Sequence, residues 1–306
     1  YVDQVGDNDL GVSLARKHGF LIAKTIHDAL TLGTDSLAVS GVLSIGEHGN
    51  YPSVPGTDQV MYPRRRFFDE IAATFKNCKK VVPVFSDKHL SYNWDDAKHM
   101  FDLSHELQIP FMAGSSVPVM WRNPSATIPI GSEVTEAIAL GYGGLEHYGF
   151  HSLEGMQCLM ERRKGGETGV KSVQSVTGEG IWQAEKEGRW SRALFDAVVE
   201  HSPTPYSGTK PRPTEMSPNA VFYLIEYRDG TKATIAMETG FSHDFVAGVS
   251  IRGQEKPFAV TFLAEENAPF RHFEHLLRAV EHMFHTGKPA YPVERTLLTT
   301  GILDVA

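Results

Sequence analysis

The sequence contains little cysteine and no long apolar stretch. Its 306 residues include two cysteines, Cys78 and Cys158, which are too few for a disulfide framework or a paired-cysteine metal site. We expect both to be free thiols in a reducing compartment. No apolar stretch approaches the roughly 18 residues that a membrane-spanning helix needs, and no signal peptide is apparent. These absences predict a cytoplasmic protein that does not enter a membrane.

Several compact catalytic motifs are also absent. The sequence has no G-x-G-x-x-G phosphate turn, no G-x-S-x-G nucleophile elbow and no H-E-x-x-H zinc motif. These absences argue against a serine hydrolase and predict no metal. The chain opens at Tyr1-Val2-Asp3 without an initiator Met, and these residues are typical of the end of a strand. We therefore expect that residues upstream of Tyr1 are missing from this sequence.

The overall charge restricts the class of partner. The chain has 29 basic and 37 acidic residues, a net charge of −8, with 41% hydrophobic and 22% charged residues. This composition is that of an ordinary globular protein. An acidic balance without a basic patch favours neither nucleic acid nor an anionic membrane as a partner.

Residues 1–124 alternate between helix-type and strand-type patterns. Glycine or a capping side chain marks several helix ends, namely Gly19 after one helix, and Thr25 and Asn93 before two others. Strands and helices alternating at this spacing predict an α/β domain with a doubly wound parallel sheet. We interpret it as an incomplete Rossmann-like nucleotide-binding domain that lacks its first strand and glycine turn. The expected helices are 9–18, 26–32, 64–75 and 94–107, and the expected strands are 20–22, 37–45, 81–85 and 109–113.

Residues 125–306 have a different pattern, which predicts an α+β domain with a mainly antiparallel sheet. Asp229-Gly230 is a strong signal for a hairpin turn between two strands. The proline-rich stretch 202–218 predicts a surface loop. We expect this domain to bind substrate and to form a homo-oligomer through its sheet. The expected strands are 170–176, 220–227, 233–238, 245–252 and 258–263, and the expected helices are 153–163 and 273–284.

Polar residues follow three of the expected parallel strands. Gly46, Glu47 and His48 come after one strand, Asp87 and Lys88 after the next, and Gly114-Ser115-Ser116, which we interpret as a structural loop, after the third. Ligands of such sheets bind beyond the carboxyl ends of the strands. An ammonium group at that edge can hold a cofactor amide or a substrate hydroxyl. The alternative is a surface lysine that pairs with its neighbouring aspartate.

The segment 141–154, GYGGLEHYGFHSLE, is the densest group of candidate catalytic side chains. His147 and His151 are four residues apart, so a helix would place them on one face, whereas a loop could aim both at one pocket. Histidine is the side chain best suited to move protons near neutral pH, and Glu154 could orient His151. The alternative is a capped helix start with hydrogen-bonded histidines. Its titratable side chains before Glu154 are Tyr142, Glu146, His147, Tyr148 and His151.

The order of these segments resembles the Gfo/Idh/MocA family, named after glucose–fructose oxidoreductase, inositol dehydrogenase and a rhizopine-catabolism protein. Asp87-Lys88-His89 is similar to the family's E-K-P motif, with the proline replaced. The segment 147–154 is similar to its D-x-G-x-H-x-x-D motif. His151, Gly149 and Glu154 match that motif, and His147 stands where an aspartate is usual. Thr286-Gly287-Lys288-Pro289 is similar to a late "tGkpp" stretch, so the resemblance spans nearly the whole chain.

The resemblance implies specific roles for these residues. It implies NAD or NADP as cofactor, with Asp3 on the ribose, Lys88 near nicotinamide and substrate, and His151 as acid/base. His147 and Glu154 would assist His151. The further cofactor-binding candidates are Gly46, Glu47, His48 and Asp87, and the candidates for contacting a carbohydrate-like substrate are Glu146, Tyr148, Trp121 and Arg122.

The leading hypothesis is an NAD(P)-dependent oxidoreductase that acts on a sugar, polyol or keto-sugar. It requires Lys88 and His151 to meet in one cleft between the two domains. A second hypothesis is a non-redox lyase or isomerase on the same scaffold, which uses the His147/His151 cluster and possibly a metal. A third is a non-catalytic relative that acts as a binding or assembly subunit.

Overall fold

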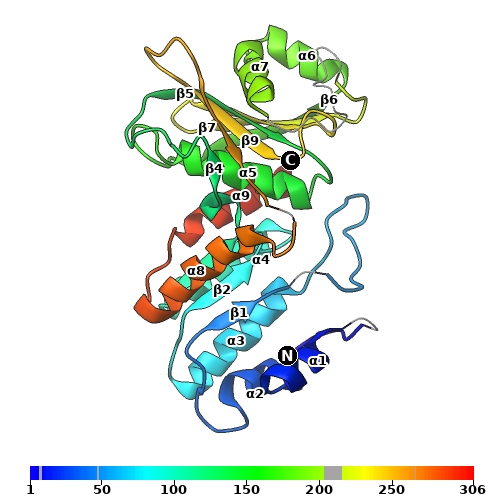
Figure 1. The fold of residues 1–306 in the computed structure, drawn as a ribbon, viewed down its shortest axis with the longest axis vertical. Helices are drawn as coiled ribbons and strands as arrows, with labels where there is room; N and C mark the ends of the chain where they lie inside the picture. The colour runs from blue at the N-terminus through cyan, green and yellow to red at the C-terminus, as the bar shows by residue number, and fades with distance from the viewer. Residues whose placement is uncertain (7–8, 47, 203–215, 266) are drawn as a thin grey trace. The chain divides into compact units, whose positions relative to one another are not determined.

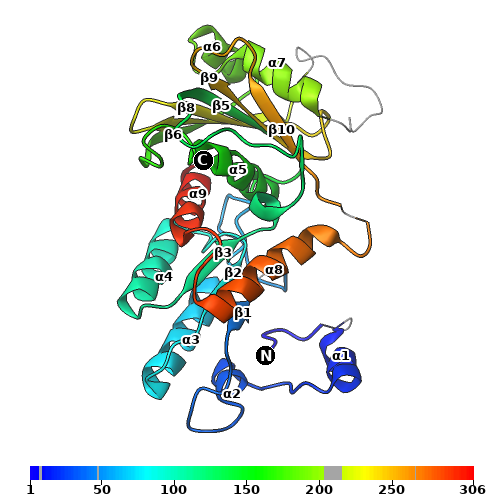
Figure 2. The same cartoon turned by 60° about the vertical axis from the view of Figure 1, so that its left-hand side comes forward.

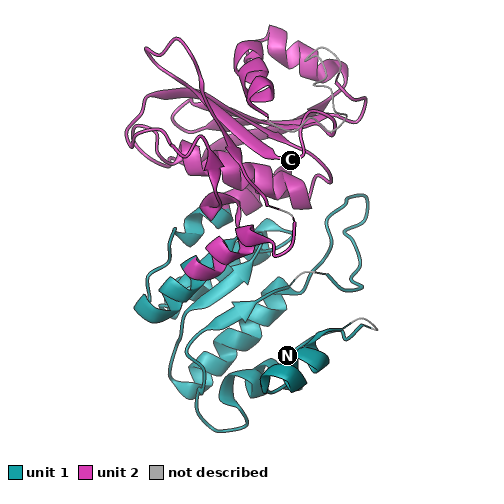
Figure 3. Cartoon of the chain, viewed as in Figure 1, with its two compact units in different colours: residues 1–114, 279–297 teal, residues 115–278, 298–306 magenta. Residues whose placement is uncertain are grey.

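The structure is a computed structural model that describes residues 1–6, 9–46, 48–202, 216–265 and 267–306. The chain forms two compact units (Figure 3). Unit 1 comprises residues 1–114 and 279–297, and unit 2 comprises residues 115–278 and 298–306. The sequence pattern changes character near residue 124, but it carries no sign that residues 279–297 return to the first unit.

Unit 1 contains a parallel sheet. In the described part of this unit, three strands follow the order β1-β2-β3: β1 (Val42–Ser44), β2 (Val84–Asp87) and β3 (Phe111–Gly114). Val84 of β2 lies beside Val42 on one side and Phe111 on the other. All residues of β2 and β3 are buried, as expected for a parallel sheet that is covered on its faces. This confirms the predicted Rossmann-like sheet.

The helices of unit 1 begin and end at the predicted signals. Asn93 accepts a hydrogen bond from the Asp96 amide at 2.8 Å, and Thr25 accepts one from the Asp28 amide at 3.0 Å; these side chains satisfy orphan donors of the first turn. Gly19 ends its helix with a φ of 73°. The described helices within residues 1–114 are α1 (Gly11–His18), α2 (Ile26–Thr31), α3 (Arg64–Cys78) and α4 (Trp94–Glu106).

Two strand predictions in unit 1 are wrong. Residues 20–22 form no strand, and Leu21 is 75% exposed. Residues 1–3 also lack strand structure. A strand needs a hydrogen-bonded neighbour, and β-propensity in three residues does not supply one. The predicted strand 37–45 is shortened to Val42–Ser44 for the same reason, because only these residues pair with β2.

Unit 2 contains a larger, mainly antiparallel sheet, as predicted. Among the described residues its strand order is β4-β10-β9-β5-β8-β7-β6, and β5 and β8 form its parallel pair. The predicted hairpin joins β7 to β8, with Gly230 at a φ of 83°. The strands are β4 (Arg122–Asn123), β5 (Val134–Gly141), β6 (Val170–Thr177), β7 (Val221–Tyr227), β8 (Lys232–Met237), β9 (Phe245–Ile251) and β10 (Phe258–Phe262).

Helices cover both faces of this sheet. Figures 1 and 2 show α5 (His147–Met160) on one side, and α6 (Glu179–Lys186) and α7 (Arg192–His201) on the other. Side chains of the central strand β5 alternate between the two cores. Ala137 and Ala139 join the core with α5, while Ile138 and Leu140 join the core with α6 and α7. The sheet faces are therefore packed within one chain, and a homo-oligomer through the sheet stays a prediction.

The remaining elements are η1 (Val117–Val119), α8 (Arg271–Thr286) and α9 (Val293–Val305). Helix α8 extends the predicted helix 273–284 at both ends, whereas β5, α6, α7 and α9 had no counterpart among the expected elements. Of the helices that the structure describes, none has the length and apolar character to span a bilayer. Most of the predicted proline-rich loop, residues 203–215, lies outside the described residues.

Candidate functional site

In unit 1, Lys88 lies just beyond the carboxyl end of β2. Its φ is 68°, and its backbone amide donates a hydrogen bond to the Gly114 carbonyl at 3.0 Å. A left-handed backbone costs a residue with a Cβ roughly 1–2 kcal/mol, and such strain is concentrated at functional sites. Lys88 Nζ lies 2.9 Å from Asp87 Oδ2, and both side chains are largely buried, at 18% and 10% exposed. The pair with Asp87 that the alternative interpretation predicted is therefore present, but it is largely buried at the carboxyl edge of the sheet and does not lie at the surface.

A buried Arg64–His89 contact adjoins this position. His89 is 2% exposed and Arg64 1% exposed, and His89 Nε2 lies 3.2 Å from Arg64 Nη1. The aliphatic part of Arg64 also fills the space beside Gly46, where an added Cβ would meet Arg64 Cγ at 2.8 Å. Gly46 is thus a glycine because Arg64 packs against its backbone. Its predicted contact with a cofactor stays a prediction.

The predicted ribose ligand, Asp3, belongs to a polar cluster in unit 1. Its carboxylate accepts hydrogen bonds from the hydroxyls of Tyr1 and Tyr51, both at 2.6 Å, and pairs with Arg66 at 2.6 Å. The bonds from Tyr1 and Tyr51, together with Arg66, lower the pKa of Asp3 to about 2. Asp3 is therefore an anion engaged by neighbouring side chains. His48, another cofactor candidate, is exposed with a φ of 65°, and Glu47 lies outside the described residues.

In unit 2, the segment 141–154 forms the end of β5, a turn and the first two turns of α5. The helix begins at His147, six residues before the predicted start. His147 and His151 therefore lie one helical turn apart on one face, which is the first of the two predicted arrangements. Both are half-buried, and Tyr148 is 36% exposed. The turn forms because Gly143 adopts a φ of 75° and donates its amide to Thr239 Oγ1 at 3.0 Å.

An aromatic wall surrounds His151. The His151 ring lies 5.4 Å from the ring of Phe245 and 6.1 Å from that of Tyr148. The Tyr142 ring stacks on the Phe245 ring at a centroid distance of 5.2 Å. These rings reduce the water around the imidazole, which strengthens its electrostatic interaction with any group that binds there. The arrangement can support proton transfer from a half-buried histidine.

Glu154 is completely buried, one turn beyond His151. One of its oxygens accepts a hydrogen bond from the Ser115 amide at 2.8 Å and another from the Ser115 hydroxyl. These bonds fix α5 to the segment that precedes η1. The predicted role of Glu154 in orienting His151 stays a prediction. Glu146 is also buried, at the N-cap position of α5.

The fold is shared with known dehydrogenases. No family model and no curated protein matches the sequence, but solved structures do. GenD2 from gentamicin A biosynthesis, solved in complex with NAD, has a TM-score of 0.61 and 12% identity, over 98% of this chain and 83% of that chain. Scyllo-inositol dehydrogenase from Lactobacillus casei has a TM-score of 0.55 and 11% identity, over 96% and 83%. UDP-N-acetylglucosamine 3-dehydrogenase from Acidithiobacillus ferrooxidans has a TM-score of 0.52 and 9% identity, over 95% and 83%.

The chain has the fold of Gfo/Idh/MocA-type dehydrogenases. The resemblance predicted from the sequence is thus confirmed for the fold. In this Gfo/Idh/MocA-type fold, Lys88 and Asp87 belong to the parallel-sheet unit, whereas His147, Tyr148 and His151 belong to the antiparallel-sheet unit. The structure brings together the members of each group.

The predicted substrate ligands Trp121 and Arg122 have different surroundings. Arg122 donates to the Pro118 carbonyl at 2.6 Å, and its guanidinium lies 5.2 Å over the Phe262 ring, so its fixed contacts are internal. Trp121 is 57% exposed and lines a cavity. Within the described ranges, no group of three or more His, Cys, Asp or Glu side chains is placed to hold a metal ion.

The segment Gly114-Ser115-Ser116 was interpreted as a structural loop, so the contact of Ser115 with Glu154 was not predicted. The Ser115 amide and hydroxyl both bind the buried Glu154, 39 residues along the chain. The available signal was its position, because it directly follows β3 at the carboxyl edge of the parallel sheet. Nothing in the local sequence marks Glu154 as its partner.

Proposed function

We propose that this chain acts as an NAD(P)-dependent oxidoreductase on a sugar, polyol or keto-sugar. The observation that carries the proposal is the strained, largely buried Lys88 at the carboxyl edge of the parallel sheet. The likeness to solved dehydrogenases supports it, since one was solved with NAD and others are named for inositol and UDP-N-acetylglucosamine.

The residues present fit the nicotinamide end of such a cofactor. The Lys88 ammonium and the backbone around Gly46 and His48 offer hydrogen-bond donors at the edge where ligands of this fold class bind. These residues and Asp87 would hold the nicotinamide ring and its amide. When bound, the nicotinamide would supply the site that accepts or releases a hydride. The glycine turn that holds the cofactor phosphates has no counterpart in these 306 residues.

His151 is proposed as the acid/base. Its half-buried imidazole would take the proton of the substrate hydroxyl during oxidation and return it during reduction. Phe245 and Tyr148 limit the orientations of the ring. His147, one turn earlier on the same face, would contact the substrate or assist the proton transfer. Glu154 would act as a positioning residue, because it fixes the helix that carries both histidines.

Lys88 is proposed to polarise the reacting oxygen. Its ammonium would stabilise the negative charge that develops on that oxygen as the hydroxyl proton leaves. Asp87 limits the orientations of the lysine side chain through the 2.9 Å ion pair. The left-handed backbone of Lys88 fixes the direction in which its side chain leaves the chain. The ammonium group is therefore preorganised before substrate binds.

The first experiment measures nicotinamide absorbance with neutral polyols, inositols and nucleotide sugars as substrates. Lys88→Met and His151→Ala should each lower kcat/KM with an accepted substrate by about 10²–10⁴-fold. Lys98→Met and His18→Ala are matched controls, because both residues lie on exposed helix surfaces. Product formation without any change in nicotinamide absorbance would favour the non-redox hypothesis. Full turnover by His151→Ala would remove His151 from the mechanism.

A double-mutant cycle then tests whether Lys88 and His151 act on the same substrate. Residues that serve one transition state give strongly non-additive losses of kcat/KM. The kcat/KM of the double variant should therefore be close to that of the less active single variant. Multiplicative losses would show that the two side chains act independently, and the proposed division of roles would be wrong.

A further inference from the structure

A cavity of about 490 Å³ lies within unit 2, between the segment after η1 and the first turns of α8. Its lining shares no residue with the histidine-bearing helix α5. The side chains that line it include Met120, Trp121, Arg271, Glu274, His275 and Arg278. Such a combination of one aromatic, two guanidinium groups, one imidazole and one carboxylate is unusual for a packing defect, which would be lined by apolar side chains.

The walls of this cavity are fixed by hydrogen bonds. Ser116 Oγ lies 2.9 Å from His272 Nδ1, which joins the segment before η1 to the first turn of α8. The Trp121 carbonyl accepts the Leu263 amide at 2.9 Å, so the backbone that carries the indole is held by β10 and the loop after it. A preformed cavity binds a ligand without first ordering its own walls.

The charges that face the cavity do not cancel. Arg278 pairs with Glu274 through Nη2 at 2.5 Å and Nε at 3.1 Å. Within the described residues Arg271 makes neither a hydrogen bond nor an ion pair. One positive charge therefore remains after the Arg278–Glu274 pair is formed. An arginine without a hydrogen-bonded partner beside a cavity suits a carboxylate or a phosphate.

His275 adds a second polar group. Its Nε2 atom is buried and has no hydrogen-bond partner in the part of the chain that the structure describes. A buried polar nitrogen without a partner costs free energy, and a ligand oxygen in the cavity would satisfy it. Arg271 and His275 are four residues apart on one helix, so they flank the same part of the cavity.

Trp121 provides an apolar surface. Its side chain is 57% exposed, and it meets the His275 ring edge-to-face at a centroid distance of 5.4 Å. Large aromatic side chains combine an apolar face with a polar edge, and aromatic side chains are common in the lining of ligand pockets. An indole face suits the flat carbon face of a sugar ring, while the neighbouring cations suit an acidic substituent.

We infer that this cavity binds an acidic sugar. Its carboxylate or phosphate would lie against Arg271 and His275, and its ring would pack on Trp121. Trp121 is also a predicted substrate contact, but the lining residues have no catalytic role in the proposed function, so the inference does not depend on the proposed redox activity. The two possible sources of the negative charge, a sugar acid and a sugar phosphate, share the same recognition chemistry.

Titration calorimetry on the whole chain, without nicotinamide, tests the inference. The probes are glucuronate, glucose 6-phosphate, neutral glucose and inorganic phosphate. At least one acidic sugar should bind about tenfold or more tightly than glucose and than inorganic phosphate, and its affinity should fall as salt is added. Arg271→Gln and His275→Gln should each weaken that binding about tenfold, whereas Arg16→Gln, on an exposed turn of α1, should leave it unchanged.

Trp121→Ala distinguishes the contribution of the sugar ring to binding from that of the acidic group. It should weaken binding of the acidic sugar and leave binding of inorganic phosphate unchanged. Circular dichroism of each variant should match that of the parent chain. Equal affinity for glucose and glucuronate, equal loss in Arg271→Gln and Arg16→Gln, or no loss in Trp121→Ala would overturn the inference. None of these results bears on the roles of Lys88 and His151, so failure here is distinct from failure of the proposed function.

Discussion

The two ends of helix α5 use polar residues in opposite ways. At its N-terminal end, His147 and His151 are half-buried and Tyr148 is exposed. At its C-terminal end every residue from Ser152 to Met160 is buried, and the chain then reaches Arg163, whose side chain is 1% exposed. Both ends carry groups that can ionise, so the presence of such groups does not by itself identify a site.

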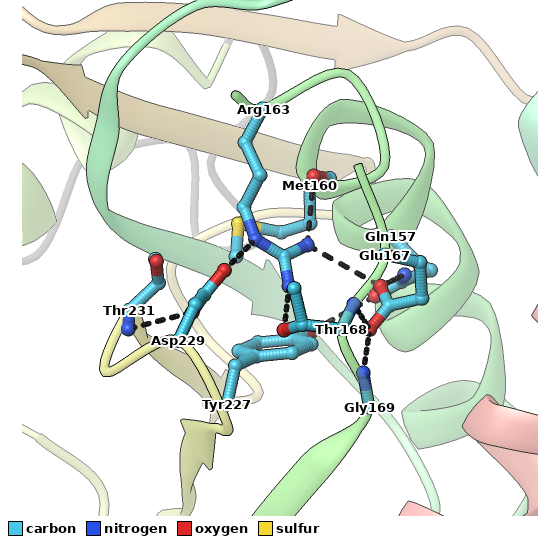
Figure 4. Close-up of polar contacts among 9 residues, drawn as sticks. All are labelled: Gln157, Met160, Arg163, Glu167, Thr168, Gly169, Tyr227, Asp229 and Thr231. Atoms are coloured by element: carbon cyan, nitrogen blue, oxygen red, sulfur yellow. Dashed lines mark hydrogen bonds and ion pairs between the residues drawn. The ribbon is translucent and has the colours of Figure 1, made fainter. Parts of the chain in front are cut away.

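The C-terminal group is a closed network (Figure 4). Arg163 donates to Asp229 at 2.7 Å, to the Met160 carbonyl at 2.9 Å and to Thr168 at 2.8 Å. It also pairs with Glu167 at 3.3 Å. Its guanidinium lies 4.5 Å over the ring of Tyr227. These partners join the end of α5 to the β7–β8 hairpin and to the start of β6.

The comparison shows how burial separates structure from function. The polar groups around Arg163 are bonded to one another inside the protein, which stabilises the fold but leaves little capacity for a ligand. Helix α5 presents its histidines at a surface, next to a glycine-containing turn. This exposure is in keeping with the catalytic role that we propose for the N-terminal end, and the two ends should respond differently to mutation.

The largest effect is expected for activity at the N-terminal end. His151→Ala should lower kcat/KM by about 10²–10⁴-fold because the proton acceptor is lost, while the midpoint of chemical denaturation changes little, since the side chain is half-buried. Steady-state kinetics and urea denaturation of the same preparation check both parts. A large loss of stability in this variant would mean that His151 supports the fold.

The opposite response is expected for Arg163→Met. Removing the guanidinium leaves the carboxylates of Asp229 and Glu167 without their cation, which should lower the free energy of unfolding by about 3–5 kcal/mol. Urea denaturation measures this loss. At a temperature where the variant is folded, its kcat/KM should stay within about twofold of the parent value, as expected for a group remote from the chemistry. A selective loss of activity would contradict the comparison.

Two glycines near the N-terminal end of α5 differ in the space that an added Cβ would find. A Cβ at Gly141 would lie 2.0 Å from Ser152 Oγ, whereas one at Gly149 would find its nearest neighbour, Tyr223, at 3.4 Å. Gly141→Ala should therefore cost about 1–3 kcal/mol of stability through overpacking. Gly149→Ala should be neutral or stabilise the chain by up to about 1 kcal/mol, because alanine favours the helix. Equal thermal shifts in the two variants would contradict this geometry.

Local signals predicted much of this fold correctly. Thr25 and Asn93 cap helices where the sequence placed them, because a cap depends on residues three positions away. The three-residue segment 20–22 was wrongly predicted as a strand, since strand formation depends on a partner that local sequence does not reveal. Helix α5 was predicted to begin at residue 153, but it begins at His147, because packing against the sheet outweighs the low helix propensity of Gly149.

Long-range contacts account for what the sequence could not predict. Ala137 to Leu140 in β5 face two cores in turn, so the strand lacks the alternation of apolar and polar residues that identifies a half-buried strand. The partner of Arg163 is Asp229, 66 residues later. The candidate residues Lys88 and His151 were selected because glycines, histidines and strand ends mark them locally. Their place in the reaction rests on the kinetic tests.

The smallest expected effect concerns acid stability at the C-terminal end. Burial opposes ionisation of Asp229, but hydrogen bonds from Arg163 and Thr231 lower its pKa from 3.8 to about 2. A folded-state pKa below the unfolded value stabilises the fold above that unfolded value, and the stabilisation is lost between about pH 4 and pH 2. Asp229→Asn should thus cost about 1 kcal/mol near pH 7, and the difference from the parent chain should shrink as the pH falls through this range. Urea denaturation at several pH values checks this, because a difference that stays constant would mean that Asp229 contributes by its shape and not by its charge.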